Sequence, residues 1–267
     1  MIRQPAVAGS FYPANPKNLA AQVAELMLSA APIHQAKALI APHAGYIYSG
    51  TVAGKLFAET DIPPQVILIG PNHHGLGADM AVSAAMAWMT PVGQVPLADK
   101  LRTRLIDDIP QLSMDDRAHQ YEHSLEVMLP FLLQRQPELE IVPIALGRLG
   151  LEDCLNLGTA LAKTLATWDQ TVLLLASSDM NHFSSAEQTE QLDALAIDAM
   201  IHYDLEKLYR VVREQHISMC GVMPAIVVMQ AARSLGASSC RLSSYSHSGK
   251  VNGDFSNVVG YAGLTIQ

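Results

Sequence analysis

The sequence predicts an α/β fold with a mixed, mostly parallel central sheet. Short apolar segments flanked by Gly, Pro or Ser alternate with longer segments whose apolar residues recur at helical spacing. Apolar runs of this length are typical of strands that are buried on both faces, as parallel strands are. The last part of the chain instead carries alternating segments around Gly and Asn turn signals, which predicts a hairpin or antiparallel edge strands.

Four apolar runs define the predicted strands, and six segments have helical spacing. The predicted strands are KALIAP (37–42), QVILIGP (65–71), EIVPIALG (140–147) and TVLLLASS (171–178). The predicted helices cover residues 19–31, 50–59, 124–133, 151–167, 188–203 and 224–235, with Ser124 as the N-cap of the third. The chain has 267 residues, of which 49% are hydrophobic, and it contains no repeat, linker or low-complexity tract. We therefore expect residues 1–267 to form a single domain.

Composition excludes several classes of partner. The formal net charge of -8 leaves no basic surface for nucleic acid or for an anionic membrane. No stretch approaches the roughly 20 apolar residues of a membrane helix, and the first residues lack the apolar core of a signal peptide. The cysteines, Cys154, Cys220 and Cys240, form an odd set without CxxC spacing, which fits a reducing compartment. We expect a cytoplasmic protein without nucleic-acid or membrane partners.

Three of the predicted strands run directly into polar, chemically capable residues. The first is followed by His43, the second by His73 and His74, and the fourth by Asp179 and His182. Ligands of open α/β sheets bind at the carboxyl ends of the strands, where loops from different strands converge. A single histidine in such a place is more often an ordinary hydrogen-bonded side chain, but the whole set favours one convergent site.

Cys220 is a further candidate for this site. It precedes Gly221 and Pro224, which mark the start of an apolar helix. A thiol at a helix N-terminus feels the positive end of the helix dipole, so we expect a lowered pKa and a thiolate suited to binding a metal. The alternative is an inert core cysteine, and we accept that interpretation for Cys154 and Cys240.

The segment HQYEH (119–123) matches the H-x-x-E-H pattern of inverted zinc peptidases. That motif requires both histidines on one face of a helix. Here the helical spacing starts only after Ser124, so we interpret the match as a coincidence. Glu122 and His123 remain candidates for the surroundings of the site.

Two further residues near the strand ends are candidates for contact with a ligand. Tyr46 follows His43 within a glycine-flanked turn, although packing in the core is an equally good interpretation. His74 adjoins His73, and adjacent residues of an extended segment point to opposite sides, so only one of the two is expected to face the site. The turn lacks the lysine of a P-loop, so we infer no nucleotide.

Six segments occur in a fixed order: AVAGSFYP (6–13), IAPHAGYIYSG (40–50), LIGPNHHG (68–75), EHSLEVMLPFL (122–132), SSDMNHF (177–183) and MCGVMP (219–224). Together they resemble the Memo-like family, which includes the Memo component of the prokaryotic AmmeMemoRadiSam system. The resemblance spans nearly the whole chain. It implies a three-layer α/β/α fold similar to the catalytic subunit of class III extradiol dioxygenases, which are non-haem iron enzymes.

The resemblance also implies roles for particular residues. The metal ligands would be His43, His73 and Cys220, so that His73 rather than His74 faces the site. His182 would occupy the position of the acid/base histidine of the dioxygenases, with Asp179 beside it. Those dioxygenases have a carboxylate where this chain has Cys220, and a softer thiolate ligand admits iron, which we favour, as well as copper or zinc.

Several functions remain open from the sequence. The favoured one is a metal-dependent oxidoreductase that acts on a small molecule, with aromatic compounds among the candidate substrates. The alternative is a non-catalytic module that binds a peptide or protein in the same cleft. A zinc hydrolase built on HQYEH and a metal or redox sensor built on Cys220 are weaker candidates. AmmeMemoRadiSam proteins are implied as partners by the resemblance, and the C-terminal edge strands could form a homo-oligomer.

Overall fold

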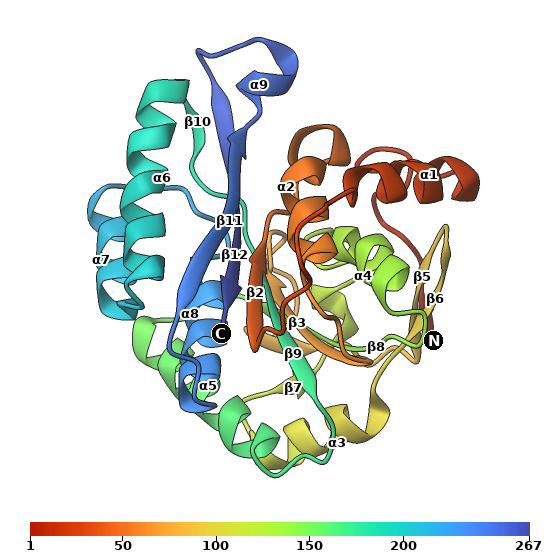
Figure 1. Cartoon of the computed structure of the whole chain (residues 1–267). Helices are drawn as coiled ribbons and strands as arrows, with labels where there is room; N and C mark the ends of the chain where they lie inside the picture. Colours follow the sequence, from red (N-terminus) through yellow and green to blue (C-terminus); the bar gives the residue numbers. More distant parts are fainter.

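The computed structural model describes residues 1–267 and contains a large mixed sheet between two layers of helices (Figure 1). The nine-stranded sheet has the order β10-β12-β2-β9-β3-β8-β4-β7, with β11 also paired to β12. Its centre is parallel, because β2, β9, β3 and β8 run in the same direction, and β12 and β4 flank this centre as antiparallel neighbours. The central strands are β2 (Ala38–Ala41), β9 (Val172–Ser177), β3 (Gln65–Pro71) and β8 (Glu140–Leu146). They are the four strands predicted from the apolar runs.

The two faces of the sheet belong to two separate hydrophobic cores. Along β3, Ile67 and Ile69 contribute to a cluster of 42 buried residues, whereas Val66 and Leu68 contribute to a cluster of 26. This alternation follows from the two-residue period of a strand, and both sets are apolar because helices cover both faces. The prediction of a three-layer α/β/α fold is thereby confirmed.

Helices of each layer come from different parts of the chain. The smaller core packs against α1 (Pro16–Leu26), α2 (Tyr46–Ala58) and α4 (Leu129–Arg135). The larger core packs against α3 (Asp99–Asp108), α5 (Leu151–Leu165), α6 (Ala186–Ile201), α7 (Leu205–Glu214) and α8 (Val222–Ser234). The sequence predicted helices in all these places except α3 and α7, which are amphipathic and each bury only a narrow stripe of apolar side chains.

The helix predicted from Ser124 begins later than expected. A 3₁₀ turn, η2 (Glu126–Met128), comes first, and α4 starts only at Leu129. The Ser124 side chain does not cap a helix, because its Oγ lies 3.4 Å from the carbonyl oxygen of Pro71. The segment before η2 is therefore an irregular loop pinned to the end of β3.

The C-terminal part of the chain forms the predicted hairpin. β11 (Cys240–His247) pairs antiparallel with β12 (Val258–Ile266), and the short helix α9 (Gly249–Asn252) lies in their connection. The short β10 (His182–Ser184) pairs with the start of β12, while β4 (Met80–Val82) and β7 (Ser113–Met114) form the opposite edge. A separate three-stranded sheet consists of β1 (Ile2–Arg3), β5 (Ala87–Thr90) and β6 (Gly93–Pro96), and η1 (Asp116–Ala118) is a second 3₁₀ turn. None of the helices combines the length and apolar character needed to cross a bilayer.

Candidate metal centre

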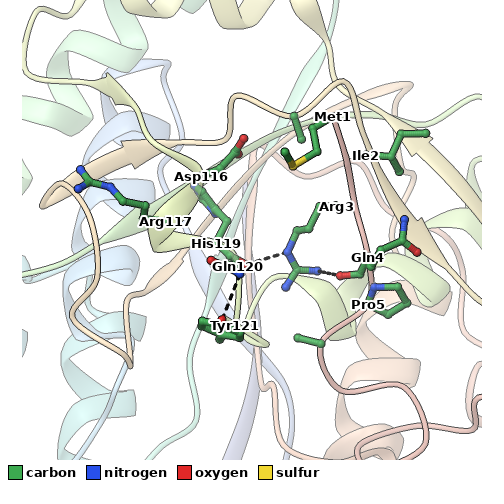
Figure 2. Close-up of a pocket in the computed structure, with 12 residues that line it drawn as sticks. Met1, Ile2, Arg3, Gln4, Pro5, Asp116, Arg117, His119, Gln120 and Tyr121 are labelled. Carbon is green, nitrogen blue, oxygen red and sulfur yellow. Dashed lines mark hydrogen bonds between the residues drawn. The ribbon is translucent and has the colours of Figure 1, made fainter.

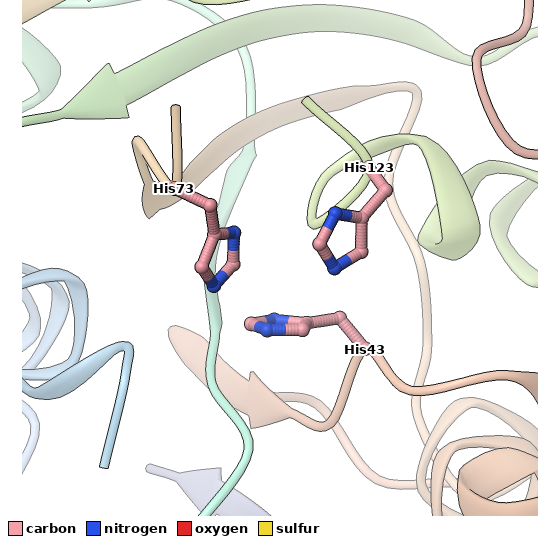
Figure 3. A group of neighbouring side chains, drawn as sticks. All are labelled: His43, His73 and His123. Carbon is pink, nitrogen blue, oxygen red and sulfur yellow. The ribbon is translucent and has the colours of Figure 1, made fainter. Parts of the chain in front are cut away.

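Three histidines from different loops meet at the carboxyl ends of the central strands. His43 follows β2, His73 follows β3, and His123 belongs to the loop between η1 and η2. Each offers one ring nitrogen, and these three nitrogens lie within 4.8 Å of one another (Figure 3). Ligand atoms of a single metal ion are about 3 to 4 Å apart when each bond is roughly 2.1 Å long, so this cluster can hold a metal with little adjustment.

His43 is held in one tautomer by the hydroxyl of Ser177. The Nδ1 of His43 lies 2.7 Å from Ser177 Oγ, and that hydroxyl donates its own hydrogen to the carbonyl oxygen of Ser124 at 2.7 Å. Because the hydroxyl has only one hydrogen, its oxygen accepts from the His43 ring. The proton therefore sits on Nδ1 and leaves the Nε2 lone pair of this buried histidine for a metal.

The carboxylate of Glu122 holds the His73 ring in the corresponding tautomer, with the proton on Nδ1. The buried carboxylate of Glu122 accepts hydrogen bonds from the Nδ1 of His73 at 2.9 Å and from its backbone N–H at 2.7 Å. Burial alone would raise the pKa of Glu122, but these bonds and a backbone bond from Ser124 hold that pKa well below its ordinary value. A carboxylate behind a ligating histidine is a common arrangement at metal sites, since it fixes the ring and increases its basicity.

His123 completes the cluster, although the sequence suggested for it only a place in the surroundings of the site. Its ring stacks on that of His73, with centroids 4.8 Å apart and planes inclined by 16°, and its Nδ1 is 3.5 Å from Glu122. The loop adopts no helix between residues 119 and 125, so the direction of the His123 side chain could not be derived from a helical face. The geometry makes His123 a candidate ligand.

The electrostatic surroundings keep two of the histidines neutral. Burial, together with the neighbouring His123 and His73, lowers the pKa of His43 well below its ordinary value. Burial also lowers the pKa of His123, and Glu122 offsets part of this effect. Neutral imidazoles are the form that binds metals, so near neutral pH these two histidines present free lone pairs.

Cys220 lies beside this cluster, immediately before α8. Its Sγ is 3.2 Å from the Nε2 of His43. The approach depends on Gly221, because a Cβ at that position would lie 2.2 Å from the carbonyl oxygen of Ser177. Cys220 is thus close enough to share an ion with His43, although it is not one of the three residues whose ligand atoms lie within 4.8 Å of one another.

The expected lowering of the Cys220 pKa is wrong for the chain without a metal. Burial raises the pKa of this thiol, and the nearby Asp179 raises it further. The desolvation of the thiolate outweighs the helix dipole, because the thiol lies between the end of β9 and the start of α8. A neutral thiol can donate its hydrogen to the His43 lone pair.

Asp179 and His182 lie near the cluster but are not bonded to each other. The buried carboxylate of Asp179 accepts a hydrogen bond from the backbone N–H of His43 at 2.7 Å, so it positions the His43 loop. Burial raises the pKa of Asp179 to about 7, and hydrogen bonds from the amides of His43 and Ala44 offset part of this rise. The half-buried His182 instead contacts Ser218 through its backbone N–H and its Nδ1.

Tyr46 and His74 make their hydrogen bonds outside the three-histidine cluster. Tyr46 is buried in the smaller core, where its hydroxyl donates to the carbonyl oxygen of Val127 and its ring packs against Phe131. The exposed His74 contacts the carbonyl oxygen of Tyr121 through its Nε2. The geometry thus favours His73 over His74 as a ligand, and it favours the core-packing interpretation of Tyr46 over contact with a ligand.

The zinc-peptidase motif is absent in three dimensions. His119 is buried on the other side of the loop, where its Nε2 donates to the carbonyl oxygen of Ala81 and its ring meets the edge of Trp88. No helix places His119 and His123 on one face. HQYEH therefore contributes a single histidine and a glutamate to the cluster.

A cavity of about 750 Å³ adjoins the same loop but does not include the histidine cluster (Figure 2). Its walls come from the first six residues of the chain, from Ala85 and from residues 116–121. Arg3 lies in this wall, and its guanidinium donates to the carbonyl oxygens of His119 and Glu122. The cavity and the cluster are thus on opposite sides of one loop.

The fold and the cluster define an α/β protein with a histidine-rich site, able to hold a metal, at the carboxyl edge of its sheet. A family model described as Memo-like protein matches residues 3–265, so the chain belongs to the Memo-like family. A MEMO1 family protein of Aquifex aeolicus is 40% identical over 266 residues, which are 98% of each chain. A MEMO1 family protein of Archaeoglobus fulgidus is 38% identical over the full length of both chains.

One solved structure extends the comparison to the fold alone. The uncharacterized protein JW3007 from Escherichia coli K12 superposes with a TM-score of 0.62 at 14% sequence identity. The match covers 85% of this chain and 98% of that chain.

Sequence reasoning missed the residues that support the ligands. Ser177 is the last residue of β9, and Ser218 precedes Cys220 by two positions, so both lie where the loops of the site converge. Serines are too frequent in such places to single out. Only the hydrogen bonds reveal that one fixes His43 and the other contacts His182.

Proposed function

We propose that this chain is a metal-dependent oxidoreductase that acts on a small molecule, with aromatic compounds among the candidate substrates, iron as the favoured metal and copper or zinc as alternatives. The single observation that carries the proposal is the meeting of three histidine nitrogens within 4.8 Å, with the Cys220 thiol next to His43. The proposal names His43 and His73 as ligands. Cys220 and His123 are the two candidates for the third position.

The donor set suits a transition metal. Imidazoles bind iron, copper and zinc, and a thiolate favours the softer of these ions. The buried Ser177 and Glu122 behind His43 and His73 provide the hydrogen bonds that ligating histidines usually make. When bound, a redox metal would supply electron transfer and would polarise an attached phenol or alcohol oxygen.

The chain's own residues would transfer a proton and would leave the metal centre open to a small molecule. Nδ1 of His182 donates to a carbonyl oxygen, so its Nε2 carries the lone pair and can take a proton from a substrate hydroxyl. The His73 and His123 side chains are 30% and 20% exposed, whereas His43 is only 2% exposed. A small molecule can therefore approach from the His73 side, while His43 forms the floor of the site.

The decisive experiment is the metal content and oxidation state of anaerobically purified protein. Near-stoichiometric iron or copper in the wild type, lost in His43→Ala, supports the proposal and justifies screening catechols and other phenols for oxygen uptake. His74→Ala is the matched control, because this exposed neighbour of His73 should keep its metal. A wild type that neither contains nor takes up metal would overturn the proposal and favour a peptide-binding module.

A second comparison identifies the third ligand. Cys220→Ser and His123→Ala are measured for metal affinity at equal protein concentration. The residue that binds the metal should lose at least tenfold in affinity when changed, in line with the loss seen even for residues behind the ligands. If both variants retain full affinity, the proposed ligand set is wrong.

A further inference from the structure

The backbone around His182 is unusual in two respects. The register of β10 against β12 shifts between His182 and Ser184, and Phe183 has a φ of 63°, a left-handed conformation that a bulky residue rarely adopts. The Phe183 side chain is 77% exposed, so its own packing does little to offset the unfavourable backbone conformation. Such strain persists only where the surrounding structure holds it in place.

Ser218 contacts His182, the residue directly before Phe183. The backbone N–H of His182 donates to Ser218 Oγ at 2.7 Å, and the Nδ1 of His182 donates to the carbonyl oxygen of Ser218 at 3.0 Å. One serine thus holds the backbone and the ring of His182 together. A carbonyl oxygen can only accept a hydrogen bond, so the neutral ring must keep its proton on Nδ1.

Asn181 in turn fixes Ser218. The Asn181 side-chain oxygen is 3.3 Å from the backbone N–H of Ser218 and 3.2 Å from its hydroxyl. This asparagine is only 2% exposed, and its amide nitrogen lies 3.3 Å from Thr189 Oγ1. The Ser218 hydroxyl can therefore accept from His182 while it donates to Asn181.

Asp193, on α6, anchors the far end of the chain of hydrogen bonds. Its fully buried carboxylate accepts from the backbone N–H of Asn181 at 2.8 Å and from the Tyr245 hydroxyl at 2.7 Å. Gly260 leaves room for it, since a Cβ there would collide with Asp193 Oδ2. A buried carboxylate held from two sides is a rigid support for a polar network.

We propose that Asn181 and Ser218 are positioning residues that lock His182 in the Nδ1–H tautomer, in which the ring lone pair is on Nε2. In many enzymes a carboxylate does this for the catalytic histidine. Here the backbone carbonyl of Ser218 accepts the Nδ1 proton of His182, and the Asn181 side chain holds Ser218 in place. The role of Asn181 and Ser218 in catalysis rests on the proposed function. The tautomer of His182 does not depend on that function.

The test is the tautomer of His182, measured on the full-length, metal-free chain with ¹⁵N-labelled histidine by long-range ¹H–¹⁵N correlation above the pKa of the ring. Comparison with His182→Gln assigns the signals. The wild type should show the Nδ1–H tautomer alone. Asn181→Leu, which removes the acceptor for Ser218, should give a mixture of tautomers, and Asn181→Asp, which retains that acceptor, should restore the wild-type pattern.

Ser218→Ala is a milder variant in case Asn181→Leu does not fold. It removes the hydroxyl contacts to His182 and Asn181, and it should also broaden or mix the tautomer signals. A pure Nδ1–H tautomer in a folded Asn181→Leu or Ser218→Ala protein would overturn the inference. Because no metal is present, failure of the proposed oxidoreductase function would leave this result unchanged, and the two failures are distinguishable.

Discussion

The two sides of the loop from His119 to Glu126 differ in what they contact. On one side, Glu122 and His123 belong to the candidate metal centre, where the side chains of His73 and His123 are partly open to solvent. On the other side, His119 and Glu126 are buried against the N-terminal segment, where Arg3 bridges them. One loop thus carries a candidate reactive face and an anchored face.

The anchored face is a dense, buried polar network. The Glu126 carboxylate accepts from Arg3 Nη1 at 2.7 Å, from Tyr12 Oη at 2.5 Å and from the amides of Ala6 and Val7. The Arg3 guanidinium also stacks over Trp88 at 4.1 Å. The difference shows how an irregular loop can hold Glu122 and His123 in fixed positions. Buried hydrogen bonds on its other face keep the loop backbone in place.

The largest expected effect comes from breaking the anchored face. Glu126→Gln leaves the Arg3 charge buried without its counter-charge, so the free energy of unfolding should fall by about 3–5 kcal/mol. Urea denaturation measures this loss. Arg104→Ala on α3, which removes a solvent-accessible ion pair with Asp108, should leave the free energy of unfolding nearly unchanged. Equal losses in both variants would show that the network is not an anchor.

The dependence of the free energy of unfolding on pH should reveal the contribution of the buried His119. Burial lowers the pKa of His119 to about 4, so between that value and the unfolded pKa near 6.5 the unfolded chain binds the additional proton. Stability from His119 is therefore full above about pH 6.5 and is lost as the pH falls toward 4, by up to about 3 kcal/mol.

Denaturation of the wild type and of His119→Gln at several pH values tests this. Glutamine can still donate to the carbonyl oxygen of Ala81 but does not titrate in this range. The wild type should lose stability relative to the variant between pH 6.5 and pH 4, whereas His74→Gln, at an exposed position, should follow the wild type. Parallel curves for the wild type and His119→Gln would contradict the burial argument.

A smaller effect is expected on the reactive face. Glu122→Gln removes the charge that holds the His73 ring, and the affinity for iron or zinc should fall by about 10–100-fold. Titration with a competing chelator measures the affinity. The exposed neighbour Gln120 provides the control, since Gln120→Ala should bind metal as the wild type does. If Glu122→Gln retains full affinity, the carboxylate does not act through His73.

The sequence was informative where apolar runs end in polar residues. The four central strands could be predicted because each is buried on both faces, and their carboxyl ends placed His43, His73 and Asp179 at one edge of the sheet. The direction of individual side chains in loops could not be predicted in the same way. Tyr46 turned into the core because it begins α2, a helix packed against the smaller core.

The loop after residue 118 shows the limit most clearly. It has neither helical nor strand periodicity, so the local pattern does not reveal that His119 and His123 face opposite sides. That division depends on Arg3 and Glu126, which are 123 residues apart in the chain. The raised pKa of Cys220 likewise depends on burial, which no local sequence feature reports.

The most direct test of the metal centre compares two buried histidines. His43 and His119 are 2% and 1% exposed, so His43→Ala and His119→Ala carry similar folding costs. Metal content is measured for both folded variants and for the wild type after anaerobic purification. Our account predicts that His119→Ala retains near-stoichiometric metal while His43→Ala contains almost none; equal metal content in the two variants would contradict it.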